Sequence, residues 1–71
     1  MISKNIKSLR CQKGISQIEL SIKTNMKQSQ ISKIENGLRK VSGEELVLIS
    51  QALEVPISKL LELEETKKEV V

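Results

Sequence analysis

The feature that most constrains the fold of this chain is a short turn, residues 24–27, between two short segments with helical character. Ser16 and Glu19 have the spacing of a capping box, which predicts a helix that ends just before the turn. Asn25 tolerates a positive φ, so the chain can turn directly into another helix at about residues 28–36. A turn this short predicts two helices that are held at a steep angle to each other.

Three more helical segments surround this pair. Apolar residues recur on one face of residues 3–13. A second capping box, Ser42 with Glu45, predicts a helix over about residues 43–53, and a short last helix is expected after Pro56. Because apolar residues do not alternate and aromatic residues are absent, nothing predicts a β-strand. The expected fold class is all-α, a compact five-helix bundle.

The length of 71 residues allows one domain with one core, which buries about 60–65% of the surface of the unfolded chain. We expect this domain to cover residues 1–63 and to be followed by a charged tail or helix extension over residues 64–71. The longest apolar run, residues 46–49, is far too short to span a membrane, and the start of the chain lacks the apolar stretch of a signal peptide. We therefore expect a cytoplasmic protein, associated with the nucleoid if it binds DNA.

Charge is distributed unevenly along the chain. Residues 1–40 hold nine basic side chains and two glutamates, a balance of +7, whereas residues 41–71 hold three basic side chains and seven glutamates, a balance of −4. This segregation is typical of a protein with one half facing a polyanion, although a merely solvated charged surface is an alternative.

The chain lacks the residues that several classes of function need. The chain has one cysteine, Cys11, and neither histidine nor aspartate. It therefore offers no familiar metal site, no acid, base or nucleophile set, and no glycine-rich phosphate loop, so we expect no enzyme activity, cofactor or small-molecule substrate. Cys11 is interpreted as a reduced bystander, with an intermolecular disulfide as the alternative. The absence of aromatic residues disfavours single-stranded RNA binding by stacking.

The third predicted helix has a face that is made only of polar residues. At about 100° per residue, one arc of about 140° holds Gln28, Ser29, Ser32, Lys33 and Asn36. The opposite side carries Ile31, Ile34 and Leu38, with Glu35 at its edge. Amides, hydroxyls and one lysine without a carboxylate are groups suited to base edges and phosphates. An ordinary polar surface remains the alternative.

Four segments of the sequence resemble one known family. SQIELS at residues 16–21 and QSQISKIENG at residues 28–37 resemble the Cro/phage-repressor, or xenobiotic-response-element, helix-turn-helix family. Residues 6–17 resemble the opening of that family's domain, and residues 46–55 resemble its closing helices. The resemblance implies a lambda-repressor-like DNA-binding domain that recognises double-stranded DNA.

The resemblance also implies roles for individual residues. The third helix is expected to enter the major groove, where the base-contacting candidates are Gln28, Ser29 and Lys33, with Ser32 and Lys27 as secondary candidates. The expected phosphate contacts are Gln17, Asn36, Arg39 and Lys40. Arg10 and Glu35 are expected to form a structural ion pair. Gln28 is suited to a bidentate contact with adenine, and Lys33 to the acceptors of guanine.

Two pairs of apolar residues depart from the polar pattern of the family. Ile18 and Ile22 lie one turn apart, away from the face of Leu20, and Val47 and Leu48 fall outside the apolar stripe of their helix. Each pair is interpreted either as a widening of the core or as a patch for a protein partner.

The leading hypothesis is a transcriptional repressor that binds a palindromic operator as a homodimer, with half-sites about 34–36 Å apart. Residue type places the dimer interface in the carboxy-terminal part, at Val55, Ile57, Leu60 and Leu63. The alternative is a protein-interaction module of the antitoxin or anti-regulator type, which would contact its partner through Ile18, Ile22, Val47 and Leu48.

Overall fold

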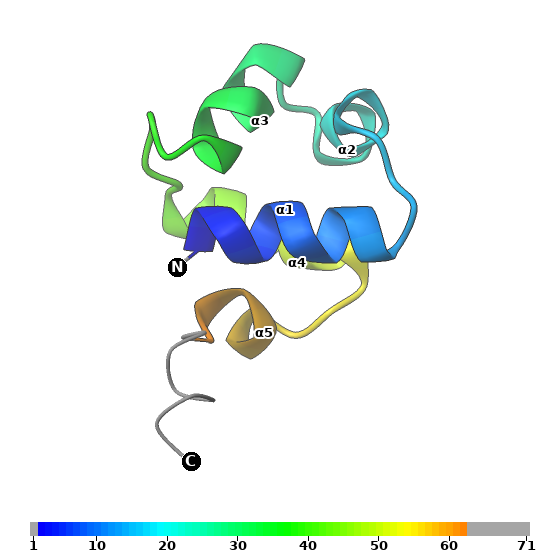
Figure 1. The fold of residues 1–71 in the computed structure, drawn as a ribbon, viewed down its shortest axis with the longest axis vertical. Helices are drawn as coiled ribbons and strands as arrows, with labels where there is room; N and C mark the ends of the chain where they lie inside the picture. The colour runs from blue at the N-terminus through cyan, green and yellow to red at the C-terminus, as the bar shows by residue number, and fades with distance from the viewer. Residues whose placement is uncertain (1, 63–71) are drawn as a thin grey trace.

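The computed structural model of the chain describes residues 2–62, which form five α-helices (Figure 1). These are α1 (Ile2–Gln12), α2 (Gln17–Thr24), α3 (Gln28–Glu35), α4 (Gly43–Leu53) and α5 (Ile57–Leu61). The expected all-α five-helix fold is confirmed. None of these helices combines the length and the apolar character that crossing a membrane requires. The expected charged tail, residues 64–71, lies outside the described residues, as does Leu63.

The helices pack around α1. In Figure 1, α2 and α3 lie on one side of α1 and α5 lies on the other. α4 contacts α1, α2 and α5, and α3 contacts both α1 and α2. Of the two helices on either side of the short turn, α3 thus packs on α1 and α2 packs on α4, and the two also pack against each other.

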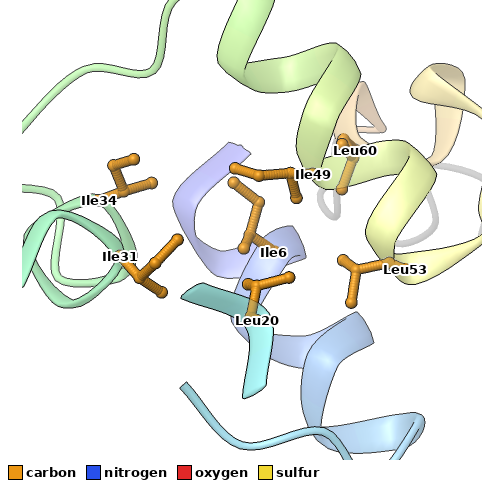
Figure 2. Packing of buried hydrophobic residues seen from close by; sticks show 7 residues of the cluster. All are labelled: Ile6, Leu20, Ile31, Ile34, Ile49, Leu53 and Leu60. Carbon is orange, nitrogen blue, oxygen red and sulfur yellow. The ribbon is translucent and has the colours of Figure 1, made fainter. Parts of the chain in front are cut away.

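The core consists of seven isoleucine and leucine side chains that are at most 1% exposed, and every helix contributes at least one (Figure 2). They are Ile6, Leu20, Ile31, Ile34, Ile49, Leu53 and Leu60. Burial of one such side chain contributes about 1.5–3 kcal/mol to folding. These contacts fix the position of α3 through its two isoleucines, while Gln28, Ser29 and Lys33 of the same helix are exposed.

The burial of Leu60 corrects one expectation. Leu60 was expected at a dimer interface, but its side chain is 0% exposed and lies in the core of the monomer. On α5, Ile57 and Leu61 are exposed instead. A leucine that is fully enclosed by its own chain cannot also contact a second copy.

The ends of the helices follow the predicted caps. At the start of α2 only one of the two bonds of the predicted capping box is present, with the Ser16 hydroxyl accepting the Glu19 N–H at 3.0 Å. At the start of α4, Ser42 and Glu45 form both bonds of a capping box, at 3.2 Å and 3.0 Å. Asn25 ends α2 with φ of 61° in the left-handed region, as predicted.

A second correction concerns Leu38. Helix α3 ends at Glu35, and Gly37 has φ of 74°, so the chain leaves the helical path before Leu38. The Leu38 side chain is 76% exposed and takes no part in the apolar side of α3. The expectation was wrong because it extended the helical periodicity past the end of the helix. Glu35, expected at the edge of that side, is buried.

One buried amide joins the two ends of the fold. Asn5 Nδ2 on α1 donates to the carbonyl oxygens of Leu60, at 2.8 Å, and Glu62, at 2.6 Å. The last carbonyl groups of a helix have no partner within the helix. Asn5 therefore caps the carboxyl end of α5 from another element.

Candidate nucleic-acid interface

The surface of interest is the outward side of α3 with the adjoining start of α2. A tight turn joins the two helices, and within it the Met26 N–H donates to the Ser21 carbonyl oxygen at 3.1 Å. Ile31 and Ile34 anchor α3 from beneath, and both are 1% exposed. The polar side of the helix is consequently presented to solvent.

The structure places the base-contacting candidates on this outward side. Gln28, Ser29 and Lys33 are exposed, Ser32 is half-buried, and Lys27 is exposed just before the first residue of the helix. The Lys27 backbone N–H donates to Gln30 Oε1 at 3.0 Å. Gln30, which sequence reasoning did not single out, thus caps the start of α3 with its own side chain.

A chain of hydrogen bonds runs from the interior to this surface. Arg10 donates to Glu35 through Nε, at 2.7 Å to Oε2, and through Nη2, at 3.0 Å to Oε1. Gln17 Nε2 also donates to Glu35 Oε1 at 3.0 Å. Gln28 Nε2 in turn approaches Gln17 Oε1 at 3.5 Å, at the long limit for a hydrogen bond.

This chain of bonds determines how Gln17 presents its amide. Because the Glu35 carboxylate only accepts, the amide nitrogen of Gln17 faces Glu35 and its oxygen faces Gln28. One N–H of the same nitrogen is left for another acceptor. The hydrogen bonds to Glu35 raise the pKa of Arg10, which keeps the guanidinium charged at the base of the network.

The remaining phosphate candidates lie toward and beyond the end of α3. Asn36 is exposed, and its Nδ2 approaches Ser32 Oγ at 3.4 Å. Lys40 is exposed in the loop that leads to α4. Arg39 is different, because its guanidinium is paired with the Glu45 carboxylate, with Nη2 to Oε2 at 2.7 Å.

The charge that residues 27–40 present to solvent depends on the burial of their one carboxylate. Between residues 27 and 40 the sequence contains four basic side chains and a single acid, Glu35. The Glu35 side chain is only 1% exposed and is paired with Arg10. The exposed side chains of α3 and its flanking loops are therefore either positive or neutral, which suits a polyanion.

The other candidates are spread over the molecule. Val55 is half-buried, and Ile57, at the start of α5, is 36% exposed. Cys11 is exposed as a free thiol. Within residues 2–62, no three side chains of His, Cys, Asp or Glu are grouped so that they could hold a metal ion.

The sequence left two interpretations of Ile18 and Ile22 on α2, a widening of the core or a patch for a protein partner, and their exposure tests the first. Ile18 is 56% exposed and Ile22 is 75% exposed, so neither widens the core. Val47 and Leu48 on α4 are 40% and 41% exposed. The core interpretation is therefore wrong for the α2 pair, and a contact with a partner remains a hypothesis.

Comparisons with known proteins agree with this geometry. A sequence profile of the helix-turn-helix family matches residues 6–60. No curated protein sequence matches the chain.

Three solved structures are similar to the chain over most of its length. The biofilm master regulator SinR in complex with DNA is 36% identical, with a TM-score of 0.82, over 87% of this chain and 100% of that one. The restriction-modification controller protein C.AhdI from Aeromonas hydrophila is 27% identical, with a TM-score of 0.81, over 83% and 89%. The SinR–SinI complex is 34% identical, with a TM-score of 0.80, over 99% and 75%.

Proposed function

The chain belongs to the helix-turn-helix family of the Cro/C1 type, and from this membership we propose that it is a repressor that binds a palindromic operator as a homodimer. DNA binding in the regulation of transcription is the function of this class. The observation that carries the proposal is the outward side of α3, which exposes amides, a hydroxyl and a lysine but no carboxylate. The proposal includes no catalytic activity, and it places the protein in the cytoplasm, at the nucleoid.

In the proposed complex, α3 lies in the major groove and reads bases with its exposed side chains. Gln28 contacts adenine through both atoms of its amide, and Lys33 donates to the acceptors of guanine. Ser29 lies beside Gln28 on the same side, while Ser32 and Lys27 reach the margins of the contact. The buried isoleucines of α3 support this role because they hold the helix rigidly against α1 and α2.

Phosphate contacts fix the register of α3 on the duplex. Gln17 retains one amide N–H for a phosphate oxygen, in addition to the one that it donates to Glu35. Asn36 and Lys40 are exposed near the end of α3, where they can reach the backbone of the same half-site. Arg39 is the fourth contact, provided that its guanidinium leaves Glu45.

The proposed dimer uses the acidic, carboxy-terminal part of the chain. Val55 and Ile57 lie where α4 passes into α5, and the Ile57 side chain is 36% exposed. Leu63 belongs to the same proposal but lies outside the described residues. A two-fold dimer through this part leaves both copies of α3 free for two half-sites.

Selection of bound sequences from random duplex DNA, followed by titration at several salt concentrations, tests the proposal. The expected result is an inverted repeat with half-sites about one helical turn apart, and an affinity that falls steeply with salt. Failure to enrich any sequence would overturn the proposed function. Enrichment of a single, non-repeated site would overturn the homodimer alone.

A second candidate function is a protein contact through α2 and α4, of the antitoxin or anti-regulator type. It is favoured by the exposure of Ile18 and Ile22, at 56% and 75%, on one side of α2. The similar SinR structure that contains SinI is a protein complex, which supports the idea that this fold accepts protein partners. Such a contact is much less sensitive to salt than DNA binding, so salt titration separates the two functions.

A further inference from the structure

We propose that Glu45 competes with a DNA phosphate for the guanidinium of Arg39, and that this competition lowers both the affinity for DNA and its salt dependence. The inference rests on the proposed function. It assigns to Glu45, which sequence reasoning used only as a helix cap, the role of a residue that sets affinity.

The pair between Arg39 and Glu45 has the geometry of an arginine–phosphate contact. Arg39 Nη1 donates to Oε1 at 3.0 Å and Nη2 donates to Oε2 at 2.7 Å, while Nη1 also approaches the Lys40 carbonyl oxygen at 3.3 Å. Arginine binds carboxylates and phosphates with the same two-pronged arrangement of N–H donors. Glu45 therefore already engages one N–H on each Nη of Arg39, the end-on pair of donors that a phosphate would use in the same arrangement.

The Arg39–Glu45 pair is also exposed enough for an anion to displace the carboxylate from the guanidinium. The side chains of Arg39 and Glu45 are 32% and 19% exposed, whereas those of Arg10 and Glu35 are 11% and 1% exposed. Ion pairs in contact with water contribute little to stability, so a strong anion can displace one partner. Of the two arginine–carboxylate pairs within residues 2–62, only this one lies within reach of solvent on the side of the α3–α4 loop.

Of the two partners, Glu45 is the one that stays in place. It is held in the first turn of α4 by its own backbone, and its side chain accepts the Ser42 N–H at 3.0 Å in the capping box. Arg39 belongs to the loop between α3 and α4, after Gly37. When a phosphate approaches, Arg39 is therefore the side chain that moves.

The substitution Glu45→Gln tests the competition without removing the cap. Glutamine accepts the Ser42 N–H as glutamate does, so the capping box is retained while the negative charge is lost. Glu44→Gln is the matched control, because Glu44 is an exposed neighbour in the same first turn and its loss changes the net charge equally.

Titration of the selected operator duplex with the wild-type protein and both variants gives the primary result. We expect Glu45→Gln to bind more tightly than Glu44→Gln. The slope of log affinity against log salt should steepen by up to about 0.9, the contribution of one phosphate contact, because Glu45 lets Arg39 reach the phosphate in only part of the wild-type complexes. In an Arg39→Ala background the two variants should behave alike. If Glu45→Gln binds no better than Glu44→Gln, or binds more weakly because Glu45 holds the loop in shape, the competition is overturned.

A second measurement uses the wild-type protein, so its result does not depend on whether a variant folds. The guanidinium NMR signals of Arg39 are expected to shift when the operator duplex is added, while those of the half-buried Arg10 stay in place. An unchanged Arg39 signal in a complex that does form would overturn the competition and leave the proposed function intact. Absence of any binding by the wild-type protein would instead overturn the proposed function, and the competition with it.

Discussion

The guanidinium of Arg10 and the carboxylate of Glu35 face each other in a two-pronged ion pair, with Nε to Oε2 at 2.7 Å and Nη2 to Oε1 at 3.0 Å. The pair joins α1 to the last residue of α3. Gln17, the first residue of α2, donates to the same carboxylate. One carboxylate thus fixes α1 relative to the two helices that form the candidate interface, α2 and α3.

Removal of Arg10 alone should destabilise the protein strongly. Arg10→Met is expected to lower the free energy of unfolding by about 3–5 kcal/mol, because it leaves the Glu35 carboxylate buried without its partner. Urea denaturation gives this quantity. Lys59→Met, which breaks an exposed ion pair with Glu62, is the control and should have a far smaller effect. Equal losses in the two variants would contradict a structural role for the Arg10 pair.

The two proposed kinds of DNA contact should respond differently to loss of a lysine. Lys33→Ala is expected to relax base preference at one position of the operator, at a cost of about 1–3 kcal/mol against the preferred base. Lys40→Ala should weaken binding to all sequences alike and reduce the salt slope by about 1. Binding titrations with single-position operator variants measure both effects. The division into base and phosphate contacts is lost if the two substitutions give the same profile.

Replacing Glu54, which has a left-handed backbone conformation, should raise the stability of the protein. Glu54 ends α4 with φ of 58°, a conformation that costs a residue with a side chain about 1–2 kcal/mol. Glu54→Gly is expected to raise the free energy of unfolding by about 0.5–1 kcal/mol, since glycine adopts this conformation freely but loses more entropy on folding. Glu54→Ala removes the same charge and keeps the strain, so thermal unfolding of both variants isolates the backbone effect. A similar gain in both would assign the effect to charge instead.

Acid should remove the stabilisation that Glu45 supplies. The hydrogen bonds from Arg39, and next the backbone N–H of Ser42, lower the pKa of Glu45 from 4.5 to about 2. A carboxyl group with a lowered pKa in the folded state stabilises the protein above its unfolded pKa and loses this effect as the pH falls. The difference in unfolding free energy between wild type and Glu45→Gln should therefore be constant near neutral pH and shrink between about pH 4.5 and about pH 2.

Urea titrations of the two proteins across this range measure that difference, and the protonation of the other glutamates cancels in the comparison. A difference that does not change with pH would show that the Arg39 pair adds nothing to folding. It would also count against the competition with DNA, because a pair that adds no stability does not hold Arg39 back from a phosphate.

Most of the fold was predictable because its signals are local. The serine caps, Asn25 and the spacing of apolar residues lie within a few neighbouring residues of each other, and the observed bounds of α1, α3 and α4 lie within one residue of those predicted. The exceptions arise where local periodicity gives no answer. The prediction that Leu38 lies on the apolar side of α3 was wrong because the helix had already ended. The prediction that Leu60 lies at a dimer interface was wrong because a helix of five residues does not define an inward face on its own.

Less of the candidate site was predictable. The outward side of α3 followed from its periodicity, whereas the roles of single residues came only from a family resemblance and remain predictions. The pair of Arg39 with Glu45 was missed because it links a loop to a helix, and no regular spacing relates such positions. The bond from Gln17 to Glu35 was missed because it depends on how α2 and α3 meet in space.

The amide of Asn5 has a consequence for the order of folding. Its bond to the Leu60 carbonyl oxygen spans 55 positions of the sequence, so it forms only after most of the chain has been brought together. Closing so large a loop carries a larger entropic cost than closing the short loops between neighbouring helices. We therefore expect α5 to dock last during folding and to detach first in the native state, with its amide hydrogens exchanging ahead of those of α1 and α4.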